Sequence, residues 1–131
     1  MRENVKIELV YVFKTSTKAL ENLITTPSGL AEWFSDDVQV NDDVYTFFWG
    51  KSEESARLLF NRKNTHIRWR WLHHEEDGND DCFFEFLYEI DPLTNDIIFK
   101  VTAVSDADTD EEDLKLLWEN GINDLRRVLG T

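Results

Sequence analysis

The chain has 131 residues, of which 41% are hydrophobic and 13% aromatic, so the sequence predicts a folded protein with a sizeable core. It has 27 Asp and Glu residues against 14 Lys and Arg residues, which gives a formal net charge of −13. This balance argues against nucleic-acid binding, which needs a surplus of basic side chains, and against attachment to an anionic membrane surface.

The single cysteine and the N-terminal segment limit the cellular setting. Cys82 is the only cysteine, which excludes an internal disulfide and a cysteine-rich zinc site. The N-terminal segment is unlike a signal peptide, because Glu3 and Glu8 interrupt it and its apolar run is short. No segment has the length of a membrane span. We therefore expect a cytoplasmic protein that does not insert into membranes.

The first part of the chain predicts one strand followed by two short helices. Apolar residues alternate with polar ones at the start, which is typical of a half-buried strand. Ser16 or Thr17 can cap the first helix, and Thr26 with Pro27 at the first helical position predicts the second. The predicted ranges are 4–14 for the strand and 17–25 and 27–34 for the helices.

Between residues 36 and 104 the pattern alternates with a period of two and predicts six strands joined as an antiparallel meander. Its pairing should place Arg68 or Arg70 across from Glu85 on the outer face. The side chains that alternation turns inward in the clearest pair of strands are Ile67, Trp69 and Trp71 on one and Phe84, Phe86 and Tyr88 on the other.

The last segment predicts a long amphipathic helix over 110–129. Its apolar residues recur every three or four positions, which is the spacing of a helix with one buried face. Thr109 and Glu112 have the spacing of a capping box at its start, and Gly130 suits its C-terminal cap. Together these elements predict a single α+β domain over 1–131, with the order β-α-α-β6-α and a curved antiparallel sheet packed on the long helix.

Three segments resemble a known family. They are residues 20–34 (LENLITTPSGLAEWF), the strand end Phe48-Trp49-Gly50, and the run 117–121 (LWENG) with Leu125 in the last helix. With the order of elements, they resemble the START-like (SRPBCC, helix-grip) superfamily, and within it the branch of homologues of the activator of the heat-shock chaperone ATPase. The resemblance implies a helix-grip fold whose members differ chiefly in what occupies the cavity between sheet and long helix.

Aromatic residues are the main candidates for a binding site in that cavity. They either line a pocket for an apolar ligand or fill the core, and the sequence leaves both alternatives open. Gly121 in mid-helix favours a pocket slightly, since close approach to the sheet or to a ligand would explain a glycine there. The candidate cavity-lining residues are Trp33, Phe34, Trp49, Phe60, Trp69, Phe84, Phe86, Phe99, Trp118, Gly121 and Ile122.

Metal binding and catalysis have little support in the sequence. The run 73–77 (HHEED) holds two adjacent histidines without a third ligand at a recognisable spacing, so we interpret it as a solvated loop. The calcium-loop-like patterns beginning at Asp77 and Asp106 lack the glycine and the terminal glutamate. We expect no metal, no cofactor and no catalytic constellation, and we interpret Cys82 as a core residue.

Three functional hypotheses follow. The first is non-catalytic binding of a hydrophobic small molecule or lipid between the sheet and the last helix. The second is a protein-interaction module resembling the chaperone-activator domain, which would use charged surfaces such as the acid-free window 57–70. The third is a polyketide-cyclase-like enzyme, which requires an inward carboxylate or histidine in contact with the pocket. The expected partners are a hydrophobic small molecule or a protein, and neither nucleic acid nor membrane.

Overall fold

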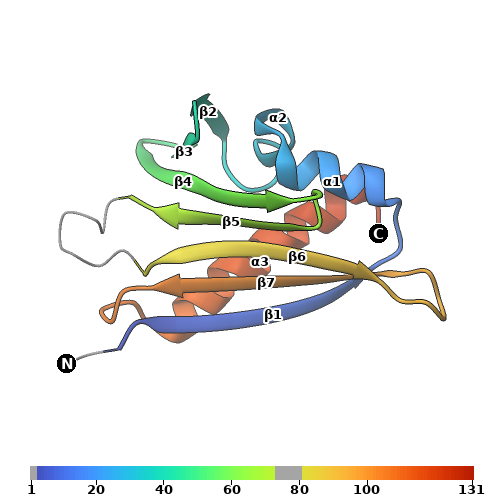
Figure 1. The fold of residues 1–131 in the computed structure, drawn as a ribbon. Helices are drawn as coiled ribbons and strands as arrows, with labels where there is room; N and C mark the ends of the chain where they lie inside the picture. The colour runs from blue at the N-terminus through green and yellow to red at the C-terminus, as the bar shows by residue number, and fades with distance from the viewer. Residues whose placement is uncertain (1–2, 73–80) are drawn as a thin grey trace.

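The computed structural model describes residues 3–72 and 81–131 and has one curved sheet with a long helix across one face (Figure 1). The sheet contains seven strands, all paired antiparallel. This confirms the predicted α+β helix-grip fold. The elements are β1 (Val5–Phe13), α1 (Thr17–Thr25), α2 (Pro27–Leu30), β2 (Asp37–Asn41), β3 (Val44–Trp49), β4 (Ser52–Arg62), β5 (His66–Trp71), β6 (Phe83–Ile90), β7 (Ile97–Ser105) and α3 (Glu111–Leu129).

The strand order explains how one helix comes to cover the sheet. Strands β2 to β7 form a meander in which each pairs with the next, and β1 pairs with β7, so the order is β1-β7-β6-β5-β4-β3-β2. The two edge strands, β1 and β2, are therefore consecutive in the chain, and α1 and α2 connect them across the sheet. Helix α3 follows β7 and crosses the inner face of the sheet, behind it in Figure 1.

Asp110, and not Thr109, caps α3, so the predicted capping box is wrong. The Asp110 carboxylate accepts a hydrogen bond from the Asp113 amide at 3.0 Å. The Thr109 hydroxyl instead donates to the Asp106 carboxylate at 3.2 Å within the preceding turn. At the other end, Gly130 adopts the left-handed conformation (φ 76°) of a C-terminal cap, as predicted.

Helix α2 has four residues, whereas the sequence predicts a helix over 27–34. The Thr26 hydroxyl caps it by accepting a hydrogen bond from the Gly29 amide at 2.9 Å. After α2 the chain tightens into turns, and the indole Nε1 of Trp33 donates to the Leu23 carbonyl of α1 at 2.8 Å. This bond fixes the turn against α1 and leaves Trp33 only 5% exposed.

The inner face of the sheet is packed with aromatic rings. Trp69 of β5 lies opposite Phe84 of β6, with their rings stacked and centroids 5.0 Å apart, as alternation predicts. From α3, the Trp118 ring lies 5.6 Å from the Phe84 ring. In the middle of the sheet, strand and helix side chains are thus in direct contact, and the rings there fill the space between them.

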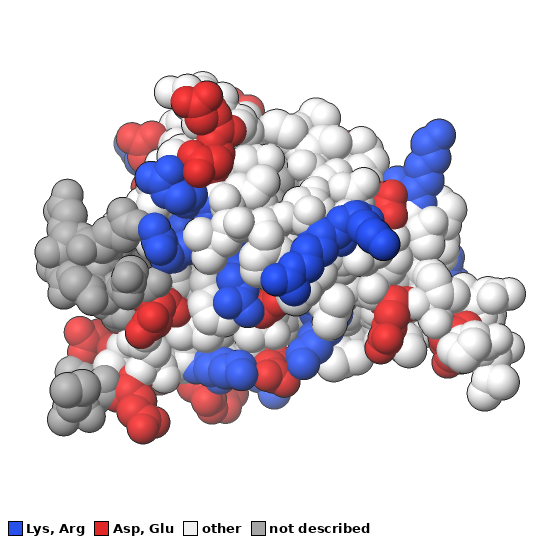
Figure 2. Space-filling model, viewed as in Figure 1, with Lys and Arg blue, Asp and Glu red and all other residues white. Residues whose placement is uncertain are grey.

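The outer face carries an ion-pair network. Arg68 lies opposite Glu85 in the β5–β6 register and donates to its carboxylate at 2.7 Å, and His66 makes a second hydrogen bond to the same group. Burial alone would raise the pKa of Glu85, but the hydrogen bonds and charges of His66 and Arg68 outweigh it and hold that pKa below its ordinary value. Figure 2 shows Lys and Arg side chains gathered across this face of an otherwise acidic protein.

Candidate functional site in the cavity between sheet and helix

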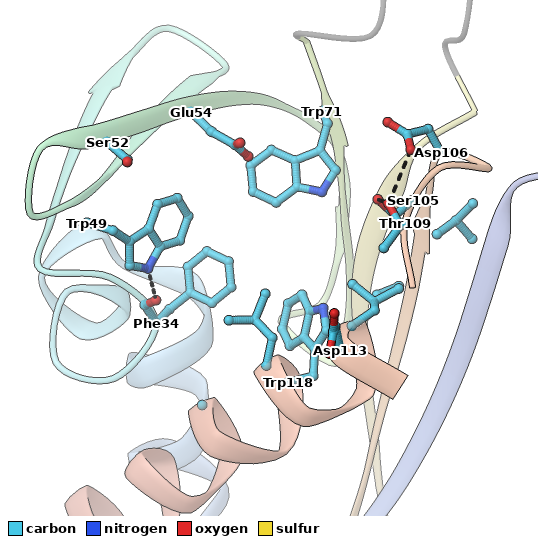
Figure 3. A pocket seen from close by; sticks show the side chains of 15 residues that line it. Phe34, Trp49, Ser52, Glu54, Trp71, Ser105, Asp106, Thr109, Asp113 and Trp118 are labelled. Atoms are coloured by element: carbon cyan, nitrogen blue, oxygen red, sulfur yellow. Dashed lines mark hydrogen bonds between the residues drawn. The ribbon is translucent and has the colours of Figure 1, made fainter. Parts of the chain in front are cut away.

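A cavity of about 680 Å³ lies between the β3–β4 hairpin, the ends of β5 and β7, and the first half of α3 (Figure 3). It is set to one side of the packed rings in the middle of the sheet. Its walls come from four strands (β3, β4, β5 and β7), from α3, and from the segments that follow α2 and precede α3. The residues that line it are Phe34, Trp49, Ser52, Glu54, Trp71, Ala103, Val104, Ser105, Asp106, Thr109, Asp113, Leu114, Leu117, Trp118 and Gly121.

Interlocked rings form one wall of the cavity. Phe34 lies at their centre, with ring centroids 5.6 Å from Trp49 and 5.4 Å from Trp118. The indole Nε1 of Trp49 donates to the Phe34 carbonyl at 2.9 Å, the bond drawn in Figure 3. Because each ring is held by its neighbours, this wall is formed before any ligand binds.

Polar side chains also line the cavity, among the rings. Glu54 comes from β4, Asp106 from the segment before α3, and Asp113 from the first turn of α3. The Ser105 and Thr109 hydroxyls are 2.8 Å apart and hydrogen-bonded to each other. None of the described residues that line the cavity is Lys, Arg or His.

Four of the eleven predicted cavity residues line this space, namely Phe34, Trp49, Trp118 and Gly121. Six others are 5% exposed or less and lie in the packed core instead: Trp33, Trp69, Phe84, Phe86, Phe99 and Ile122. The prediction left out the remaining lining residues. Trp71 was predicted to point inward, and Leu114 and Leu117 belong to the apolar positions of the last helix, so the sequence contained a signal for these three.

Phe60 lies on the outer face of the sheet, and its prediction as a cavity residue is wrong. A β-bulge shifts the β4–β5 register between Leu58 and Phe60, so that Leu58 lies opposite Trp69 and Phe60 opposite Arg68. The extra residue moves Phe60 to the face opposite the cavity. There the Arg62 guanidinium lies 4.4 Å from the centre of its ring.

The described residues contain no cluster of three His, Cys, Asp or Glu side chains that could hold a metal ion. The HHEED run at 73–77 lies outside the described residues. In the second calcium-loop-like pattern, the Asp106 carboxylate accepts hydrogen bonds from the Asp108 amide and the Thr109 hydroxyl, and Asp110 caps α3. These carboxylates therefore stabilise a turn and a helix start. In the described part of the chain, no helix is both long and apolar enough to cross a membrane.

Carboxylates do reach the cavity, which is the condition set by the enzyme hypothesis. Glu54, Asp106 and Asp113 line it, but no Cys, Lys or His that could act as a nucleophile or as a base near neutral pH is found among the described lining residues. Cys82 is fully buried and is not one of them. The geometry therefore offers carboxylates facing an apolar space, and one of them, Asp106, accepts a hydrogen bond from the Thr109 hydroxyl.

We expect the Cys82 thiol to react very slowly in the folded protein. Burial raises its pKa to about 11, and the negative charges of Asp106 and Asp81 act in the same direction. Since the thiolate is the reactive form, reaction with a disulfide reagent at pH 8 should be slower than in urea-unfolded protein by about a hundredfold or more. The absorbance of the released thiol, followed over time in the folded and in the urea-unfolded protein, gives the ratio of the two reaction rates. A folded-state rate equal to the unfolded one would contradict the buried, protonated thiol.

Comparisons with known proteins agree with this architecture. A family model described as the START-like superfamily domain matches residues 1–131. The solution NMR structure of BfR322 from Bacteroides fragilis is 36% identical, with 97% of this chain and 91% of that chain covered and a TM-score of 0.65. A search of curated proteins found no match.

Two more distant structures share the fold. The solution structure of the Aha1 dimer from Colwellia psychrerythraea is 16% identical in sequence and has a TM-score of 0.79. The match covers 95% of this chain and 96% of the Aha1 chain. CalU16 from Micromonospora echinospora is 11% identical, covers 98% of this chain and 85% of that chain, and has a TM-score of 0.73. At these identities the likeness shows the fold alone. The family model and the identity to BfR322 show more: the chain belongs to the START-like superfamily.

Proposed function

We propose that the protein binds an apolar small molecule or lipid in the cavity between the sheet and α3, without performing chemistry on it. One observation carries the proposal. The cavity measures about 680 Å³, within the range of small-molecule sites, and its wall of Phe34, Trp49 and Trp118 is held in place by ring contacts.

The mechanism is the burial of apolar surface. The contacts of Phe34 hold the Trp49 and Trp118 rings in position, so binding costs little ordering of the protein. Leu114 and Leu117 of α3 supply the aliphatic part of the wall. Each Å² of apolar surface that the ligand and these side chains remove from water contributes about 25 cal/mol. A START-like domain has this sheet-and-helix architecture, which agrees with a binding role.

Two adjacent leucines of α3 provide the test. Leu117 lines the cavity and Leu116 does not, yet both are largely exposed, at 67% and 56%. Leu117→Gln should weaken binding of an apolar probe such as 1-octanol by about fivefold to tenfold, because one aliphatic wall group is lost. Leu116→Gln should leave binding unchanged. Calorimetric titration measures both affinities.

The five tryptophans locate the probe. Trp49, Trp71 and Trp118 line the cavity, whereas Trp33 and Trp69 are buried away from it. On titration, the indole N–H resonances of the first three should shift and those of the last two should move little. If no resonance shifts at any accessible probe concentration, or if both leucine variants behave alike, the proposal is wrong.

A protein-interaction role is the second candidate, favoured by the charge of the outer face. In the acid-free window 57–70, the side chains of Arg57, Arg68 and Arg70 lie on this face. Figure 2 shows Lys and Arg side chains across this surface. Part of that charge is neutralised within the protein, since Arg57 pairs with Asp43 at 3.0 Å and Arg68 with Glu85. A partner held by the remaining charge should dissociate as salt screens it. The polyketide-cyclase-like hypothesis is third, supported by the cavity carboxylates alone.

A further inference from the structure

We propose that the ligand of the cavity is an organic cation with an apolar body, such as an alkylammonium or arylammonium compound, and not a fatty acid. This inference rests on the proposed binding function and adds the charge of the ligand to it. The cavity itself is the evidence for a ligand. The charges and rings around the cavity decide which ligand fits.

Among the described residues, the charged side chains that line the cavity are all acidic. Glu54, Asp106 and Asp113 approach it from three parts of the chain, a strand, a connecting segment and a helix. Figure 3 shows their carboxyl groups at different sides of the space between the rings. No basic or histidine side chain occurs among the described lining residues. Apolar walls with charges of one sign concentrate the field inside a cleft, which attracts a cation and repels an anion.

The rings suit the same ligand. Three indoles, those of Trp49, Trp71 and Trp118, surround the space, and tryptophan has the aromatic face that attracts ammonium groups best. The indole N–H of Trp49 is already bonded to the Phe34 carbonyl. Trp49 therefore presents its ring to the cavity and no hydrogen-bond donor for an anion.

Two of the three hydroxyl groups that line the cavity are already hydrogen-bonded within the protein and do not favour an anion. Ser105 and Thr109 bond to each other, and Thr109 also donates to the Asp106 carboxylate. A carboxylate ligand would thus lie among three like charges with these two hydroxyls already engaged. Its desolvation would be poorly compensated. The cavity should therefore discriminate between ligands of equal length by the sign of their charge.

Three probes with the same eight-carbon chain test this discrimination. Octyltrimethylammonium, 1-octanol and octanoate are titrated into the full chain below their micelle concentrations, with the indole N–H resonances as the readout. The cation should bind about tenfold more tightly than the alcohol, because it adds ring and carboxylate attraction. Octanoate should bind more weakly than the alcohol. High salt should reduce the difference between cation and anion.

A matched pair of double variants separates the cavity charge from the net charge of the protein. Glu54→Gln with Asp113→Asn removes two carboxylates that line the cavity. Glu53→Gln with Glu112→Gln removes the two adjacent carboxylates, which do not line it and belong to the same strand and the same first turn of α3. The first variant should lose about tenfold in affinity for the cation, and the second less than twofold.

The outcomes distinguish a failure of this inference from a failure of the proposed binding function. If 1-octanol and octanoate bind at the same indoles as tightly as the cation, the cavity binds ligands but does not select charge, and the inference is overturned. Equal losses in the two variants also overturn it, because the cation then responds to the net charge alone. If none of the three probes moves the cavity indoles, both the inference and the proposed function are wrong.

Discussion

Replacing Gly29 with alanine is expected to lower the free energy of unfolding by about 3 kcal/mol or more. A Cβ atom at this position would lie 2.0 Å from the Asn22 carbonyl oxygen and 2.8 Å from the Leu23 Cα. Both are backbone atoms of α1, so the overlap can be relieved only by moving α2 away. That movement also breaks the Thr26 cap on the Gly29 amide. Urea unfolding followed by tryptophan fluorescence measures the loss.

Gly121→Ala is the control, with an effect of the opposite sign. Close approach to the sheet would explain a glycine in mid-helix, but the structure leaves room there. The nearest atom to an added Cβ is Cζ3 of Trp33 at 3.9 Å, an ordinary contact. Alanine should therefore stabilise α3 by about 0.5–1 kcal/mol through helix propensity. These contacts would be contradicted if Gly29→Ala stabilised the protein, or if Gly121→Ala lowered the free energy of unfolding as much as Gly29→Ala does.

The fold could be predicted because burial imposes a period on each element. One face of the sheet is buried, so β5 and β6 alternate clearly. Of the two arginines predicted to lie across from Glu85, Arg68 or Arg70, the structure has Arg68. The helix caps Ser16 and Thr26 follow from local hydrogen bonding. Each of these features depends on neighbouring residues or on one buried face. A single sequence contains that information.

Phe60 shows where alternation fails. The bulge between Leu58 and Phe60 adds one residue to β4, and every side chain beyond it changes face. The residues around it are apolar or aromatic on both sides of the bulge, so neither register looks wrong in the sequence. The pairing with β5 decides the register, and it depends on residues that are distant in the chain.

The sequence predicts where the cavity lies, but not which residues line it. Alternation gives the face of a ring, yet whether that ring fills the core or lines a cavity depends on its position along the strand. Phe84 lies in the middle, under Trp118, and is fully buried. Trp49 and Trp71 are the last residues of their strands, and both line the cavity between these strand ends and α3. Whether a ring fills the core or lines the cavity therefore depends on where it lies along its strand relative to α3.

Replacing Phe84 with alanine is expected to lower the free energy of unfolding by about 3–5 kcal/mol. The ring is fully buried and lies between strand and helix, 5.0 Å from the Trp69 ring and 5.6 Å from the Trp118 ring. Its removal leaves a void that neither neighbour can fill without leaving its own contacts. Chemical unfolding monitored by far-UV circular dichroism gives the change. Phe84→Leu, with a smaller loss of volume, keeps the measurement possible if alanine prevents folding.

Phe83→Ala is the matched control, since this residue directly precedes Phe84 in β6 and faces the other way. Its ring is partly exposed on the outer face, with the Arg68 guanidinium 4.2 Å from the ring centre. Loss of that contact and of a half-buried ring should cost less than about 2 kcal/mol. If the two substitutions lower the free energy of unfolding by the same amount, the ring of Phe84 does not fill the space under α3. The cavity would then continue beneath the middle of the sheet, and the boundary between core rings and lining rings would have to be moved.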